Sequence, residues 1–139
     1  MAISEPYLLF KDNCAEAMRF YQSVLGGKLD VMTYGDSPAK EHTPPGNDDK
    51  VIHARLELPG GGVIMASDDV MATNYQGMNG FYVSLGFLSV DEGKRAFDAL
   101  SEGGTVNMPF GATFWSPGFG MLVDKFGTPI MIGSAPEKQ

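Results

Sequence analysis

The side chains best suited to chemistry are His53 and Arg55, two positions apart in the segment VIHARLEL at residues 51–58. Polar and apolar residues alternate there, which predicts a β-strand that places the pair on one face with Val51 and Glu57. A histidine can transfer a proton near neutral pH and an arginine can hold an anion. The pair is therefore a candidate site for an anionic small molecule, although a solvated strand face or a dimer contact would show the same pattern.

A second candidate is aromatic. Phe114, Trp115 and Phe119 cluster in the segment TFWSPGF, where a proline and a glycine interrupt any regular structure. Such a group could form the floor of a pocket for an apolar ligand. It could equally fill the open side of a sheet as part of the core.

The remaining reactive groups have structural explanations. Cys14 falls in the first turn of a predicted helix, where the helix dipole could lower its pKa, but no histidine is placed to activate it, so we expect a buried, inert thiol. Asp68 and Asp69 are adjacent and would point to opposite sides of an extended chain, which favours a turn or a cap. Asp124 is expected to cap the turn that ends at Gly127.

Composition limits the classes of protein to consider. The chain has 139 residues, a formal net charge of −7 and one cysteine. This length suits one domain, and the negative charge disfavours nucleic acid and anionic membranes as partners. One cysteine excludes an internal disulfide and a cysteine-based zinc site. With no long apolar run and no basic, apolar leader, we expect a cytoplasmic protein.

The first half reads as strand, helix and three strands. Asn13 and Glu16 have the spacing of a capping box, and Gly26 and Gly27 end the apolar helical pattern that follows. The polar, proline-rich segment 35–50 is a surface loop, either a lid over a cavity or a disordered excursion. The expected elements are a strand at 6–10, a helix at 14–25 and strands at 28–34, 51–58 and 63–67.

The second half repeats this order. Ser89 and Glu92 again have capping-box spacing, and Gly103 and Gly104 close the helix. The expected strands are at 80–88, 105–110, 119–123 and 129–133.

The two halves can be aligned directly. Residues 20–27 and 97–104 share a phenylalanine and two glycines at an offset of 77, and residues 53–65 and 119–131 match at an offset of 66. The difference of eleven residues falls on the long loop of the first half. One βαβββ unit used twice explains both matches.

Two such units, with the motifs below, resemble the vicinal oxygen chelate superfamily, which includes glyoxalase I, extradiol dioxygenases and bleomycin-resistance proteins. Within it the chain resembles the PhnB-like branch, some of whose members carry a 3-demethylubiquinone methyltransferase label. No glycine-rich strand-to-helix loop of the kind that binds nucleosides supports methyl transfer here. The segments that carry the resemblance, over about residues 6–133, are PYLLF, EAMRFYQSVLGG, VIHARLELPGG, FDALSEGG, MPFGATFW and FGMLVDKFG.

The resemblance implies a fold and an assembly. It implies an α+β protein in which two βαβββ modules, at about 5–68 and 80–134, form an open, curved eight-stranded mixed sheet around a cleft. The whole chain, 1–139, would then be a single glyoxalase/bleomycin-resistance-like domain of a bacterial type. Modules of this superfamily often pair across subunits, so a homodimer is expected.

The resemblance also allows a test of metal chemistry. Metal-dependent relatives hold a divalent ion with His, Glu or Gln on the first and fourth strands of each repeat. The fourth-strand positions here fall on Met65 and Met131, and the first-strand positions fall on or near Glu5 and Tyr82. Because a thioether is a poor ligand for a hard or borderline divalent ion, we expect no metal site and no cofactor.

The sequence therefore predicts a metal-independent protein that binds a small apolar or aromatic ligand, which can be anionic, and it assigns no catalytic residue. One alternative is a divalent-metal lyase, isomerase or dioxygenase of glyoxalase type with ligands such as Glu5, His53 and Glu57. Another is a non-catalytic interaction protein whose cleft is filled by side chains. The candidate ligand-binding residues are His53, Arg55, Met65, Tyr82, Phe114, Trp115 and Met131.

Overall fold

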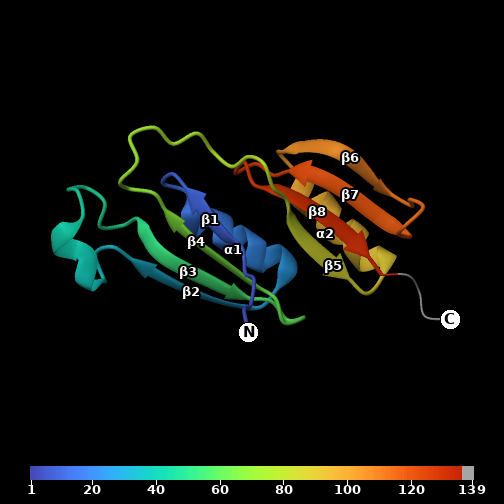
Figure 1. Cartoon of the computed structure of the whole chain (residues 1–139), viewed down its shortest axis with the longest axis horizontal. Helices are drawn as coiled ribbons and strands as arrows, with labels where there is room; N and C mark the ends of the chain where they lie inside the picture. The colour runs from blue at the N-terminus through green and yellow to red at the C-terminus, as the bar shows by residue number, and fades with distance from the viewer. Residues whose placement is uncertain (136–139) are drawn as a thin grey trace. The chain divides into compact units, whose positions relative to one another are not determined.

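The computed structural model describes residues 1–135 (Figure 1). Contacts within the chain define two compact units, Met1–Gly77 and a second that begins at Met78. Each unit has the predicted order of strand, helix and three strands, so the α+β class and the βαβββ repeat are confirmed. No helix within residues 1–135 is long and apolar enough to span a membrane.

The first unit is a four-stranded sheet with a helix against one face (Figure 1). Its strand order is β1-β4-β3-β2, with β1 parallel to β4 and the other pairs antiparallel. Its elements are β1 Tyr7–Phe10, α1 Cys14–Leu25, β2 Lys28–Thr33, the 3₁₀ helix η1 Pro38–His42, β3 Val51–Glu57 and β4 Val63–Asp68.

The second unit has the same plan. Its sheet order is β5-β8-β7-β6, with β5 parallel to β8 and α2 against one face (Figure 1). Its elements are β5 Val83–Phe87, α2 Val90–Ser101, β6 Thr105–Gly111, β7 Gly118–Val123 and β8 Pro129–Ser134.

Each unit has its own core between sheet and helix. Because strand side chains alternate between faces, every second residue of a strand points toward the helix. In the first unit the core residues include Leu8, Phe10, Met18, Tyr21, Leu56 and Ile64. In the second unit they include Val83, Leu85, Phe97, Leu100, Leu122 and Ile132. Among the elements of residues 1–135, no helix of the same unit covers the opposite face of either sheet.

The register of the strands confirms the sequence repeat. In the first unit Tyr7 pairs with Met65, and in the second Ser84 pairs with Met131. Ser84 lies 77 positions after Tyr7, and Met131 lies 66 positions after Met65, which are the two offsets found in the sequence. Residues related by these offsets therefore occupy equivalent places in the two sheets.

The two helices begin differently. Ser89 accepts a hydrogen bond from the Glu92 backbone N–H at 3.1 Å, as the second capping box predicts. The first capping box is wrong, because the Asn13 side chain makes no capping bond. Instead the Cys14 backbone N–H donates to Oδ1 of Asp68 at the end of β4, at 3.0 Å.

Asp68 also fixes the start of β3. Its Oδ2 accepts a bond from the Val51 backbone N–H at 2.9 Å, and its side chain is buried. One carboxylate thus joins β4 to both α1 and β3. Bonds of this charge-assisted kind are about twice as strong as neutral ones.

An irregularity in β3 corrects the predicted face of Val51. Met32 pairs with His53 but Thr33 pairs with Val51, so β3 carries an extra residue at Ile52. Such a bulge breaks the alternation of side chains. Val51 is consequently 1% exposed and belongs to the core, while His53 and Arg55 keep a common face.

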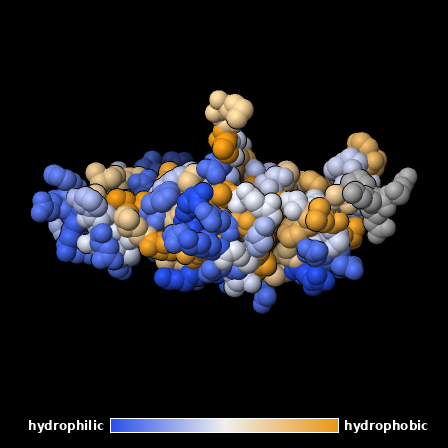
Figure 2. All heavy atoms as spheres, turned by 90° about the horizontal axis from the view of Figure 1, so that it is seen from below, coloured by the Kyte–Doolittle hydropathy of each residue, from blue (hydrophilic) through white to orange (hydrophobic). Residues whose placement is uncertain are grey.

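The long loop of the first unit is organised rather than a featureless excursion. It contains η1, whose N-cap Ser37 accepts a bond from the Ala39 backbone N–H. At the end of the loop, Lys50 forms an ion pair with Asp12, with Nζ 3.6 Å from Oδ1. Figure 2 shows hydrophilic side chains at the end of the first unit that carries this loop. Whether it acts as a lid stays a prediction.

Candidate functional site

The uncovered face of the first sheet brings polar and thioether side chains together. Tyr7 on β1, Met65 on β4, Arg55 on β3 and Asp30 on β2 are paired in one row across the strands. His53 lies on the same face, two residues before Arg55. Three of the predicted ligand-binding residues, His53, Arg55 and Met65, are therefore neighbours in the structure.

Tyr7 joins this group although the sequence did not indicate it. A hydrogen bond of 3.2 Å links Tyr7 Oη to His53 Nδ1, and the two rings lie 5.7 Å apart. The imidazole Nε2 lies on the other side of the ring from this bond, so His53 uses only one of its two ring nitrogens to bond Tyr7. The signal that could have found Tyr7 is its alternation with the buried Leu8 in β1.

Arg55 is held by its neighbour on the same strand face. Its guanidinium forms an ion pair with the Glu57 carboxylate, and both side chains are partly exposed. Such a pair between accessible groups is worth at most about 1 kcal/mol. An anionic ligand could therefore displace Glu57 from the guanidinium at little cost.

Two further tyrosines bond to the backbone of β4 and β1. Tyr34 donates its hydroxyl to the Asp68 carbonyl at 3.3 Å, and Tyr75 donates to the Leu9 carbonyl at 2.6 Å. Burial, with a smaller contribution from the Asp69 carboxylate, raises the pKa of both phenols. They stay protonated at neutral pH and act as hydrogen-bond donors to the backbone.

The predictions for the other reactive groups hold. Burial, and to a lesser extent the Asp68 carboxylate, raises the pKa of the Cys14 thiol to about 12, so it is inert at neutral pH. Asp124 Oδ1 accepts bonds from the backbone N–H groups of Phe126 and Thr128, each at 2.9 Å. Asp124 therefore caps the turn before β8.

The equivalent row in the second sheet contains no charge. Ser84, Met131, Met121 and Met108 are paired in register across β5, β8, β7 and β6. Met131, a predicted ligand-binding residue, thus lies in a row of three thioethers. Methionine side chains adapt their shape to what they contact, which suits an apolar ligand.

The predicted aromatic group forms at the β6–β7 turn. Trp115 makes edge-on contacts with Phe114 at 4.7 Å and Phe119 at 5.3 Å between ring centroids. Phe114 is 98% exposed and Trp115 is 50% exposed, so neither fills a core within the second unit. The assignment of these two residues to ligand binding stays a prediction.

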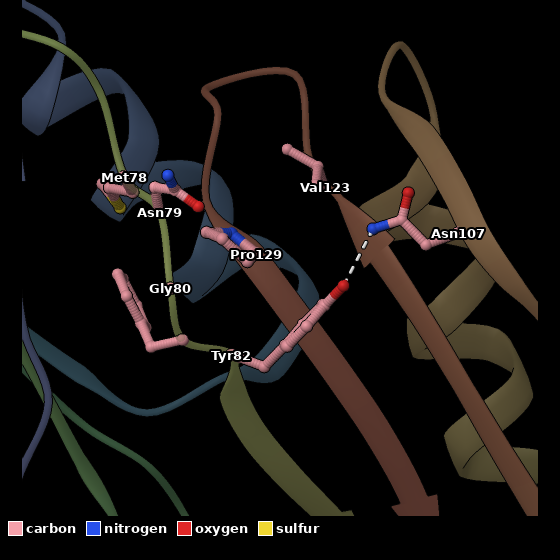
Figure 3. Close-up of a pocket in the computed structure, with 8 residues that line it drawn as sticks. Met78, Asn79, Gly80, Tyr82, Asn107, Val123 and Pro129 are labelled. Atoms are coloured by element: carbon pink, nitrogen blue, oxygen red, sulfur yellow. Dashed lines mark hydrogen bonds between the residues drawn. The ribbon is translucent and has the colours of Figure 1, made fainter.

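Tyr82 lies at a cavity of its own unit (Figure 3), and the residues of the aromatic group are not among those that line it. The cavity has a volume of about 450 Å³. Asn107 on β6 donates a hydrogen bond from Nδ2 to Tyr82 Oη at 3.0 Å. The residues that line it are Met78, Asn79, Gly80, Phe81, Tyr82, Asn107, Val123 and Pro129.

The donor set does not fit the divalent metal that the resemblance implies. The strand partners of Met65 and Met131 are Tyr7 and Ser84, two residues further along than the expected Glu5 and Tyr82. A phenol, a hydroxyl and two thioethers are poor ligands for a hard or borderline ion. Within residues 1–135 no three His, Cys, Asp or Glu side chains cluster in a way that could hold a metal.

The fold and these motifs define a glyoxalase-like protein, and comparison of the sequence with protein families agrees. Residues 4–132 match the Glyoxalase/Bleomycin resistance protein/Dioxygenase superfamily. The chain belongs to this superfamily.

Particular relatives are similar over almost the whole chain. Protein YjdN of Escherichia coli K12 is 37% identical over 136 residues, with 91% of each chain covered. The crystal structure of PA1353 from Pseudomonas aeruginosa is 43% identical with a TM-score of 0.87, covering 97% of this chain and 98% of that one.

A third relative supports the PhnB-like resemblance. The structure named putative 3-demethylubiquinone-9 3-methyltransferase, PhnB protein, from Bacillus cereus is 26% identical with a TM-score of 0.78. The match covers 96% of this chain and all of the other.

Proposed function

We propose that the protein binds a small anionic molecule without a metal, on the uncovered face of the first sheet. The observation that carries this proposal is the hydrogen-bonded pair of Tyr7 and His53 on the same face as Arg55. A guanidinium offers paired donors to a carboxylate, and imidazole and phenol can add further bonds. Met65, between Tyr7 and Arg55 in the row, would contact the apolar part of the ligand.

The place of Met65 supports binding over metal catalysis. It stands where the resemblance puts a metal ligand, and its neighbours in the row are a phenol and a guanidinium. Once an anion displaces Glu57, the Arg55 guanidinium offers it directed N–H donors, which a cation cannot use. A divalent-metal enzyme would need donors that the described residues do not bring together.

The binding test compares variants of the proposed site with a control arginine outside it. Benzoate serves as the anionic aromatic probe, and its affinity is measured by NMR titration or calorimetry. Arg55→Ala and His53→Ala should each weaken binding, whereas Arg95→Ala should leave it unchanged, because Arg95 is exposed on α2. Unchanged affinity in the Arg55 and His53 variants would remove the proposed site.

The metal test is elemental analysis of untagged protein purified without chelator, followed by melting scans with Ni, Zn, Mn and Fe(II). We expect no near-stoichiometric metal and no melting shift of several degrees. A bound metal or a large shift would contradict metal independence and direct attention to lyase and isomerase chemistry.

We also propose that the chain acts as a single domain and as a homodimer in the cytoplasm. The superfamily match across both repeats supports one domain. The exposed aromatic pair of Phe114 and Trp115 supports a contact between copies, because apolar side chains of this size are usually covered. Light scattering at several concentrations would test the dimer, and a monomer at all of them would refute it.

A further inference from the structure

The cavity of the second unit differs from the face of the first in that no lining residue carries a charge. Its volume of about 450 Å³ lies within the range of small-molecule sites. Phe81, Met78 and Pro129 supply apolar surface, and Tyr82, Asn107 and Asn79 supply polar groups. Because no lining side chain offers an opposite charge, an ionic ligand would gain no charge-assisted bond here, so this composition favours a neutral ligand.

Asn107 has no counterpart in the first unit. In the second sheet Val106 pairs with Leu122 and Met108 pairs with Met121, so Asn107 is an extra residue in β6. The equivalent residues of β2, Leu29 and Asp30, pair with consecutive residues of β3 without an insertion. A β-bulge of this kind re-aims one side chain, and here Asn107 meets Tyr82 (Figure 3).

The hydrogen bond between the two residues determines what they can offer a ligand. Asn107 uses one N–H to donate to Tyr82 Oη, which leaves its own carbonyl oxygen as an acceptor. Tyr82 accepts that bond and keeps its hydroxyl proton to donate. One donor beside one acceptor is complementary to a carboxamide, whose carbonyl accepts and whose N–H donates.

We propose that this cavity binds a neutral aromatic carboxamide or lactam, held by Tyr82 and Asn107 with its ring against Phe81, Met78 and Pro129. This site is independent of the anion site proposed for the first unit. It gives the chain a second ligand of different chemistry.

The experiment uses benzamide and benzoate, two probes of the same shape that differ in charge and in the presence of an N–H. Benzamide added to ¹⁵N-labelled full-length protein should shift the backbone amides of Gly80, Phe81, Tyr82 and Asn107. Benzoate at the same concentration should leave these amides unshifted. For so small a probe, dissociation constants in the millimolar range are expected.

Variants then test the polar pair. Asn107→Ala should weaken benzamide binding roughly fivefold to tenfold, as expected for one lost hydrogen bond. Tyr82→Phe should have a similar effect while retaining the ring, and Asn74→Ala, an exposed asparagine of the first unit, should have none.

Two outcomes would overturn the proposal. The first is a benzamide response outside the cavity, or an affinity for benzamide that neither variant changes. The second is benzoate binding at these amides as strong as that of benzamide. Failure of the anion site is recognised separately, because it would appear as missing benzoate shifts at His53 and Arg55 with the benzamide shifts intact.

Discussion

The two units share one backbone plan, but the uncovered faces of their sheets differ in chemistry. The row that reads Tyr7, Met65, Arg55 and Asp30 in the first sheet reads Ser84, Met131, Met121 and Met108 in the second. Methionine occupies the same place in both rows only on the fourth strand, at Met65 and Met131. Within this row the strand pairing is equivalent in the two sheets, so the row changes through its side chains, which shows how one scaffold can present different sites.

The units also differ in how the fourth strand is joined to the rest. Ser134 occupies the place of Asp68, 66 positions later, and its hydroxyl donates to the Ser89 carbonyl at 3.1 Å. The residue equivalent to Val51 is Pro117, which has no backbone N–H to satisfy. A carboxylate is therefore required in the first unit and not in the second.

The largest expected effect comes from this contrast. Asp68→Ala removes two buried, charge-assisted hydrogen bonds and should lower the free energy of unfolding by about 3 kcal/mol. Ser134→Ala removes one bond between neutral groups and should cost about 1 kcal/mol. Urea denaturation of both variants measures the difference, and equal losses would contradict the different roles of the two positions.

The next effect concerns the charged row. Arg55→Met gives the first unit the residue found at the equivalent position, Met121, and should weaken benzoate binding about tenfold or more, as expected for a lost charge-assisted bond. Benzamide binding, measured in the same NMR titration, should not change. A loss of both ligands would show that the two sites are not independent.

A smaller, pH-dependent effect should arise from Cys14, whose equivalent in the second unit is the exposed Asp91. The pKa of the thiol is raised to about 12 in the folded protein, so an unfolded chain ionises first as pH rises. Stability should be unaffected below about pH 8 and fall above about pH 9, with a slope approaching 1.4 kcal/mol per pH unit.

Denaturation at pH 8, 9 and 10 would measure this slope, and Cys14→Ala should reduce it. The native thiol should also resist iodoacetamide at pH 8 until the protein is unfolded. Rapid alkylation of the folded protein would contradict the burial of Cys14.

The smallest effect is expected at the connection between the second and third strands of each unit. This connection is a long hydrophilic loop in the first unit and a short aromatic turn in the second. In dilute protein, where copies are apart, Phe114→Ser should change the free energy of unfolding by less than about 0.5 kcal/mol, because the side chain is 98% exposed within its own chain. A larger loss that grows with protein concentration would indicate a contact between copies.

The sequence predicts regular features well and local pairing poorly. Hydrophobic periodicity and glycine positions place α1 at its observed bounds, Cys14–Leu25, and the internal offsets identify equivalent residues of the two sheets. The capping residue of α1 was predicted wrongly, although its start was right, because Asp68 lies 54 residues away and local spacing cannot report such a contact.

The candidate site was predicted in part for the same reason. His53, Arg55 and Met65 share a face because alternation is a local property. The bulges at Ile52 and Asn107 depend on how two strands are paired, so Val51 was misplaced and Asn107 was missed. Tyr7 was overlooked because one short apolar strand offers little to distinguish its two faces.

The extra residue at Asn107 has a consequence for how such proteins diverge. β6 is an edge strand of its sheet and pairs only with β7, so an insertion there disturbs one ladder. Descendants of a duplicated gene could therefore gain or lose a residue at this point with little effect on folding. The edge strand offers protein engineers the same freedom to reshape a pocket by changing length rather than residue type.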